Sequence, residues 1–339
     1  MKAILWILVA SIAACTTVDA PRAEPPQAKT SEVVAATEHF VFNSNFLLNL
    51  HDYLDWLVDE GEHQPAAEAD CFATLTGKAR EGWAQALAVY RADLGKRDQL
   101  HDAEMVALRY RLAGIDTGDF GARFREAVAG HGLLLAGAAD AYRGCVWPAQ
   151  DERNREWIAR AVPLVAAHEA EFSGRLAAYF AEPWPATPTP VAVVRYSTWY
   201  GANTVTRPHH IMIGGDDPGN QGHSALETVF HEVSHTMVSP RNGAVARTLA
   251  ATAARSGRAV PRGLWHGILF YTVGQVVKQA FRESGVADFE SSYEEVLPRA
   301  WPTFLGPLQS EWQPYLDGKI SMEEAASRLL LRLTESEAA

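Results

Sequence analysis

The sequence predicts an α+β protein that is mainly α-helical. From residue 31 to residue 183, apolar residues recur at three- and four-residue spacing, which is typical of amphipathic helices. Four prolines between residues 183 and 190 end this pattern, because proline lacks a backbone donor and is excluded from helix interiors. Two short β-branched runs follow at residues 191–196 and 209–213, and helical periodicity returns at residue 224. We therefore expect a small β-sheet among many helices.

The helices can be placed from their apolar stripes and from the residues that interrupt them. The first stripe consists of Phe46, Leu47, Leu50, Leu54 and Leu57. Further helices are expected at residues 83–94, 102–112, 120–142 and 157–180. After the strands and a Gly/Asp/Asn-rich loop, helices are expected at residues 225–238, 263–283, 293–304 and 322–334. The change in composition divides the chain into a helical N-terminal region, residues 31–183, and a second region, residues 184–339.

The first 30 residues have the features of an export signal. Lys2 precedes an apolar segment at residues 3–12, which has the length of a signal-peptide core and is too short to span a bilayer as a helix. The segment leads to Cys15 in a sequence that resembles a bacterial lipobox, so residues 1–15 are expected to be a lipoprotein signal peptide with Cys15 lipidated. Secretion with cleavage after Ala20 is the alternative. Residues 16–30 are rich in Pro and Ala and predict a flexible tether.

Cysteine usage and charge agree with this location. Besides Cys15, the chain has Cys71 and Cys145, and in the oxidising cell envelope we expect these two to form a disulfide. Two separate buried thiols are the alternative. The net charge of −11 argues against a nucleic-acid partner, since an acidic surface repels phosphates. We expect a protein that is anchored to a membrane only through its N-terminal lipid and that faces the periplasm.

One motif carries most of the functional information. His231, Glu232 and His235 form the sequence H-E-x-x-H within a predicted helix, which Ser224 and Glu227 would start as a capping box. Histidines at i and i+4 project from one helical face and can bind one metal ion. Glu232 lies one residue further round the helix, so it can take a proton from a metal-bound water as general base.

These residues, with the strand and loop before them, resemble the zincin metallopeptidases over about a quarter of the chain. The resemblance implies Zn2+ as the cofactor, bound by His231 and His235, with Glu232 as the general base. It also implies a zincin-like core: a small β-sheet, an active-site helix and a ligand-bearing helix. The continuation typical of metzincins is absent, because Val238 and Arg241 stand where that group has a Gly and a third His.

The third metal ligand is the open question of the motif. In gluzincins a Glu on a second helix completes the site, but no Asp or Glu lies between Glu232 and Glu283 in this chain. His266 is the only histidine after His235 and lies near the start of the helix expected at residues 263–283. We expect His266 to be the third ligand, with Glu283 as its competitor. A histidine buried in an apolar stripe, without a metal, is the alternative for His266.

The sequence thus predicts a zinc metallopeptidase of the bacterial cell envelope, which hydrolyses amide bonds in peptide or protein substrates. A catalytically inactive zinc-binding protein and a purely structural helical lipoprotein are the alternatives. Several residues near the motif could stabilise a transition-state oxyanion, although each is more easily explained by a structural role. They are Tyr196, Tyr200, His209, His210, His223 and Tyr271.

Overall fold

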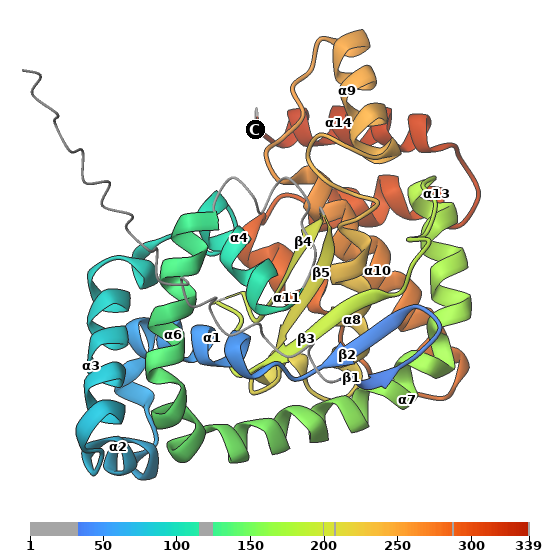
Figure 1. Cartoon of the computed structure of the whole chain (residues 1–339). Coiled ribbons are helices and arrows are strands. Elements are labelled where there is room, and N and C mark those ends of the chain that lie inside the picture. Colours follow the sequence, from blue (N-terminus) through green and yellow to red (C-terminus); the bar gives the residue numbers. More distant parts are fainter. Residues whose placement is uncertain (1–32, 115–124, 199, 207, 287, 338–339) are drawn as a thin grey trace, which may run out of the picture.

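A computed structural model of the chain describes residues 33–114, 125–198, 200–206, 208–286 and 288–337 (Figure 1). The expected signal peptide, Cys15 and the tether lie outside these residues. Within them the fold is α+β and mainly helical, as predicted, with one five-stranded sheet. None of the helices described is both long enough and apolar enough to cross a bilayer.

The sheet has a parallel centre and two antiparallel edges. Its strands are β1 (Val33–Ala36), β2 (Phe40–Asn43), β3 (Thr189–Val194), β4 (Ala202–Thr206) and β5 (His209–Gly214). They lie in the order β1-β2-β3-β5-β4, with β2, β3 and β5 parallel. The outer strands β1 and β4 run antiparallel to their neighbours. The two predicted strands are confirmed as β3 and β5.

Three strands are not predicted from the sequence, and each has a physical reason. β1 and β4 are edge strands, which bury less apolar surface than central strands and therefore show a weaker apolar pattern. β2 has only four residues and lies directly before the helical stripe that starts at Phe46. The region from residue 31 to residue 183 is therefore not purely helical, and the sheet joins strands from both sides of the predicted division.

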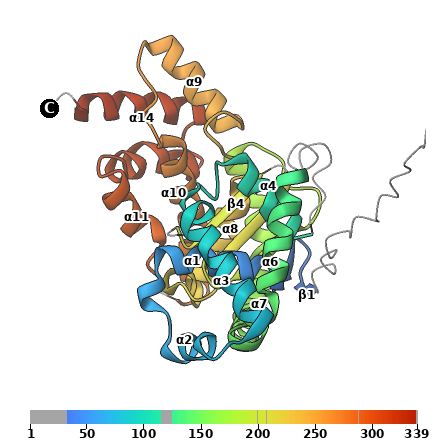
Figure 2. The same ribbon diagram turned by 60° about the vertical axis from the view of Figure 1, so that its left-hand side comes forward.

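The helices form two groups. The first group consists of α1 (Phe46–Asp59), α2 (Ala66–Ala73), α3 (Gly77–Ala92), α4 (Ala103–Leu112) and α6 (Arg125–Cys145). The second consists of α7 (Trp147–Phe180), α8 (His223–Ser234), α9 (Ala244–Ser256), α10 (Leu264–Glu283), α11 (Ser292–Ala300) and α14 (Met322–Glu337). Short helical turns are η1 (Gly61–His63), η2 (Leu94–Lys96), η3 (Pro218–Asn220), α12 (Leu305–Pro307), η4 (Leu308–Trp312) and α13 (Gln313–Leu316). Figure 2 shows α9, α10, α11 and α14 gathered at one end of the molecule.

Alternating residues of the central strands separate two apolar cores. Successive side chains of a strand point to opposite faces of a sheet. Val191 and Val193 belong to the core that contains α7, α8 and α10. Ala192 and Val194 belong to the core of the first helical group. Both faces of β3 are thus buried, and the helix that carries the histidine motif lies against one of them.

The long helix α7 ties the two halves of the chain together. It begins at Trp147 rather than at the predicted residue 157, because Pro148 occupies the first turn, where a missing backbone N–H costs nothing. Asn154 of this helix donates hydrogen bonds to the hydroxyl of Ser44 (3.0 Å) and to the carbonyl of Val193 (3.1 Å). These bonds hold α7 in register with β3.

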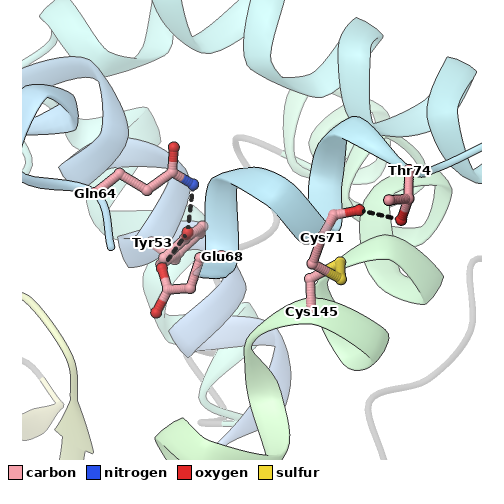
Figure 3. The surroundings of a disulfide bond; sticks show 6 residues. All are labelled: Tyr53, Gln64, Glu68, Cys71, Thr74 and Cys145. Carbon is pink, nitrogen blue, oxygen red and sulfur yellow. Dashed lines mark hydrogen bonds between the residues drawn. A yellow bond between two sulfur atoms is a disulfide. The ribbon is translucent and has the colours of Figure 1, made fainter. Parts of the chain in front are cut away.

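A disulfide joins Cys71 at the end of α2 to Cys145 at the end of α6, as the sequence predicts (Figure 3). Beside it, the hydroxyl of Tyr53 donates to Glu68 of α2 at 2.7 Å. The cysteines are 74 residues apart, so the bond removes much freedom from the unfolded chain. Loops of this length correspond to a stabilisation of about 2–4 kcal/mol.

A buried charged network lies inside the first helical group. Arg109 of α4 is 1% exposed and donates to Asp52 of α1 at 3.3 Å. Asp55, one turn further along α1, accepts a hydrogen bond from Gln99 at 3.0 Å. The pKa of Asp55 is raised to about 8, chiefly by burial and also by the carboxylates of Asp52 and Asp59, against the opposing charge of Arg109. One guanidinium therefore faces more acidic groups than it can neutralise.

Replacing Asp55 with Asn should make the protein more resistant to unfolding at alkaline pH. The folded-state pKa of Asp55 lies above its ordinary value of 3.8, so its contribution to stability is greatest below pH 4 and is lost as the pH rises towards 8. Asn keeps an acceptor for Gln99 and cannot ionise. Urea unfolding should show the variant gaining about 2 kcal/mol or more over the parent between pH 5 and pH 9. Parallel pH profiles for the two proteins would contradict this assignment.

Candidate metal centre

The start of α8, which carries the motif, differs from the prediction. The helix begins at His223, and Gly222 precedes it with a positive φ of 56°. No side chain caps it, so the predicted capping box of Ser224 and Glu227 is wrong. The carboxylate of Glu227 is instead turned inward, where it accepts hydrogen bonds from two serines at the start of α11.

The end of α8 also comes earlier than the predicted residue 238. The helix ends at Ser234, and the following residues form a tighter turn in which the N–H of His235 bonds to the carbonyl of Glu232 at 3.2 Å. His235 still has helical backbone angles (φ −60°, ψ −19°). Its side chain therefore stays on the same face as His231, and the i, i+4 arrangement required for a shared metal ion is preserved.

The first turn of α10 brings His266 to these two histidines. Gly263 precedes this helix with a left-handed φ of 83°, and His266 follows within the first turn. The Nε2 atoms of His266 and His231 lie 3.3 Å apart, and one ring nitrogen of each of the three histidines lies within 4.8 Å of the others. Among the residues described, this is the group of side chains that is close enough to hold one metal ion.

Glu283, the competing ligand, does not join this group. It ends α10, far along the helix from His266, and its carboxylate accepts a hydrogen bond from Gln279 at 2.9 Å. The packing of α10 against α8 therefore brings His266, and not Glu283, to the two histidines of the motif.

Burial puts the three histidines in the form that binds metals. Burial lowers the pKa of His235 to about 4 and of His266 to about 3, and it lowers the pKa of His231 well below its ordinary value. The nearby imidazoles add to this effect for His231 and His266. Neutral imidazole is the ligand form of histidine. The three ring nitrogens can therefore act as neutral donors to a metal ion.

Glu232 directly follows His231 on α8, and its carboxylate is held by β4. It is 6% exposed, and its Oε2 atom accepts a hydrogen bond from the hydroxyl of Thr204 at 2.7 Å. The same hydroxyl lies 2.8 Å from the backbone carbonyl of Glu232. Burial raises the pKa of Glu232 to about 7, while the bond from Thr204 lowers it. Thr204 is a site residue that the sequence does not reveal, because β4 shows no clear strand pattern.

Aromatic rings surround the imidazoles. The ring of Trp265 stacks on His266 with centroids 4.7 Å apart and planes at 8°. Phe270 packs against His231 (4.0 Å) and His266 (4.7 Å), and Trp301 meets His266 edge-on at 5.6 Å. These contacts orient the rings and limit the access of water. In the sequence, Trp265, Phe270 and Trp301 cannot be distinguished from ordinary core residues, so their contacts with the histidines were not predicted.

Three residues considered as oxyanion stabilisers have other contacts, and a fourth, His210, is buried with neither ring nitrogen hydrogen-bonded to the residues described. Tyr196 and Tyr271 donate hydrogen bonds to side chains outside the histidine group. The ring of His223 packs on Phe281. His210 is buried near Arg109, where burial and the arginine charge lower its pKa to about 3. The sequence-based preference for structural roles agrees with these contacts.

Replacing His266 with Ala should weaken the binding of Zn2+ by about two orders of magnitude, since one of three nitrogen donors is lost. Competition with a chromophoric chelator measures this. His209→Ala is the matched control, because this half-buried histidine lies on β5 outside the group. The Zn2+ affinity of this variant should stay within about two-fold of the parent value. Unchanged Zn2+ affinity in the His266 variant, with only lower stability, would make His266 an ordinary core residue.

No protein-family model, no curated protein and no solved structure matches this chain.

Proposed function

We propose that this chain is a zinc-dependent hydrolase that cleaves amide bonds in peptides or proteins. The observation that carries the proposal is the convergence of three imidazoles, one buried and two partly buried, from the helix that also carries the buried carboxylate of Glu232 and from the helix packed against it. Three imidazole donors are typical of catalytic zinc sites, in which the fourth position is left for water or substrate. The arrangement resembles that of zincins, with His266 in place of the Glu that the second helix supplies in gluzincins.

Glu232 has the properties required of the general base. A bound zinc ion would lower the pKa of its water and polarise the substrate carbonyl. Glu232 follows His231 directly and so lies beside the metal-binding face without occupying it. Burial raises the pKa of Glu232 above the ordinary value of a carboxylate, which makes it a stronger base towards water. Thr204 would hold the carboxylate in the orientation for this transfer.

The edge of the sheet supports a peptide as the substrate. β4 is the last strand in the order, so its outer backbone groups have no strand partner among the residues described. An extended peptide can pair with such an edge as an additional strand. Since Thr204 of β4 bonds to Glu232, a peptide on this edge would pass next to the general base.

We further propose that the protein works in the bacterial cell envelope, attached through lipid on Cys15. The disulfide between Cys71 and Cys145 supports an oxidising compartment, where such bonds persist.

Replacing Glu232 with Gln should retain stoichiometric zinc and reduce hydrolysis by about 100-fold or more, because the base is lost while the three nitrogen donors remain. Metal analysis of the purified full-length chain and cleavage of unstructured casein would measure the two properties. A parent protein that neither contains nor binds zinc would contradict the proposal. Zinc without hydrolysis in the parent would indicate an inactive metal-binding protein.

Replacing Thr204 with Val should lower kcat by about ten-fold and leave KM and zinc content nearly unchanged, because one hydrogen bond to the carboxylate is lost. Thr206→Val on the same strand is the control, since the hydroxyl of Thr206 makes no bond to Glu232. Equal kcat values for the two variants would remove Thr204 from this role.

A further inference from the structure

A second buried carboxylate lies on α8, one turn before the first histidine. Glu227 is 3% exposed, and its Oε1 atom accepts hydrogen bonds from the hydroxyls of Ser291 (2.7 Å) and Ser292 (2.5 Å). The backbone N–H of Ser292 lies 3.2 Å from each carboxylate oxygen. Three donors from the start of α11 thus converge on one side chain of the motif helix.

The same end of α11 is tied to α10. Gly274 of α10 leaves room for it, because a Cβ atom there would lie 2.1 Å from the hydroxyl of Ser291. Next to this contact, Gln275 donates to the hydroxyl of Tyr293 at 2.8 Å. Lys278 pairs with Glu294 at 2.6 Å. The start of α11 is therefore bonded to both helices that carry the histidines.

The other end of α11 reaches His266. Trp301 follows the last residue of α11, and its ring lies against His266. The same ring covers Gly263, because a Cβ atom added to Gly263 would come within 2.4 Å of the indole nitrogen. Between the two ends, Leu297 approaches Gly267. α11 therefore runs antiparallel along α10, from Gly274 back to the first turn, and the two helices lie side by side in Figure 2.

We propose that Glu227 is a positioning residue for the metal centre, which holds α11 against α8 and so places His266 beside His231 and His235. This inference rests on the proposed metal site. A metal centre tolerates ligand displacements of only about 0.2 Å, whereas apolar helix packing permits larger shifts. The directional bonds of Glu227 are satisfied in one register of the helices.

Energetics supports a positioning role over a stabilising one. Taking a carboxylate out of water costs free energy that its hydrogen bonds roughly offset, so an apolar residue of similar size would hold the helices about as firmly. An apolar contact would, however, accept several registers. A buried carboxylate with three donors restricts the geometry more than it strengthens the fold.

The test compares zinc affinity and the visible spectrum of the Co2+-substituted full-length protein across matched variants. Glu227→Ala should weaken Zn2+ binding by about ten-fold or more and alter the Co2+ bands. Glu227→Gln keeps an acceptor and should restore most of the affinity. Ser292→Ala removes the hydroxyl that donates to Oε1 of Glu227 and leaves α8 unchanged. It should weaken Zn2+ binding by several-fold even if Glu227→Ala does not fold.

Glu169→Ala is the matched control. Glu169 is a carboxylate of α7 that is 6% exposed and accepts hydrogen bonds from the backbone N–H groups of Glu38 and His39 at 3.1 Å. Its loss should lower stability and leave Zn2+ affinity within about two-fold of the parent. If the Glu227 and Ser292 variants bind Zn2+ as tightly as this control, the positioning role is overturned. A parent protein without zinc affinity overturns the proposed metal site itself, so the two failures differ.

Discussion

The burial of α8 between the sheet and α10 imposes the main constraint on this structure. Val229, Phe230 and Val233 of this helix are completely buried, and four of its polar residues are buried with them: Glu227, His231, Glu232 and Ser234. Ionisable groups in such a place must be neutral, hydrogen-bonded or bound to an ion. Burial keeps the three imidazoles neutral, and their ring nitrogens converge, so they form a group that could hold a metal ion.

Two carboxylates of α8 show how environment separates roles on one helix. Glu227 accepts hydrogen bonds from three donors of α11 and has little capacity left for chemistry. Glu232 accepts a side-chain hydrogen bond only from Thr204 among the residues described, and its pKa lies near 7 because of burial. The first carboxylate suits the positioning of helices, and the second suits proton transfer.

The first helical group supports the site from the opposite face of the sheet. Asn49 of α1 donates to the carbonyl of Val193 in β3, at 3.1 Å. Tyr110 of α4 donates to the carbonyl of Pro208 at 2.6 Å, next to the turn between β4 and β5. These contacts bond the first helical group to β3 and to the connection between β4 and β5, next to the strand that carries Thr204.

Local patterns in the sequence were sufficient for the helical character, for β3 and β5, for the pairing of Cys71 with Cys145 and for the i, i+4 histidines. The helices, the two strands and the histidine pair depend on spacing within one element. The disulfide depends on cysteine, a residue type that occurs too rarely in this chain to offer many pairings. Only tertiary packing decided that His266 rather than Glu283 lies near the motif histidines, that Glu227 turns inward and that Thr204 contacts Glu232. These contacts join segments that are 28 to 65 residues apart, and periodicity carries no information about which helix turn meets which strand.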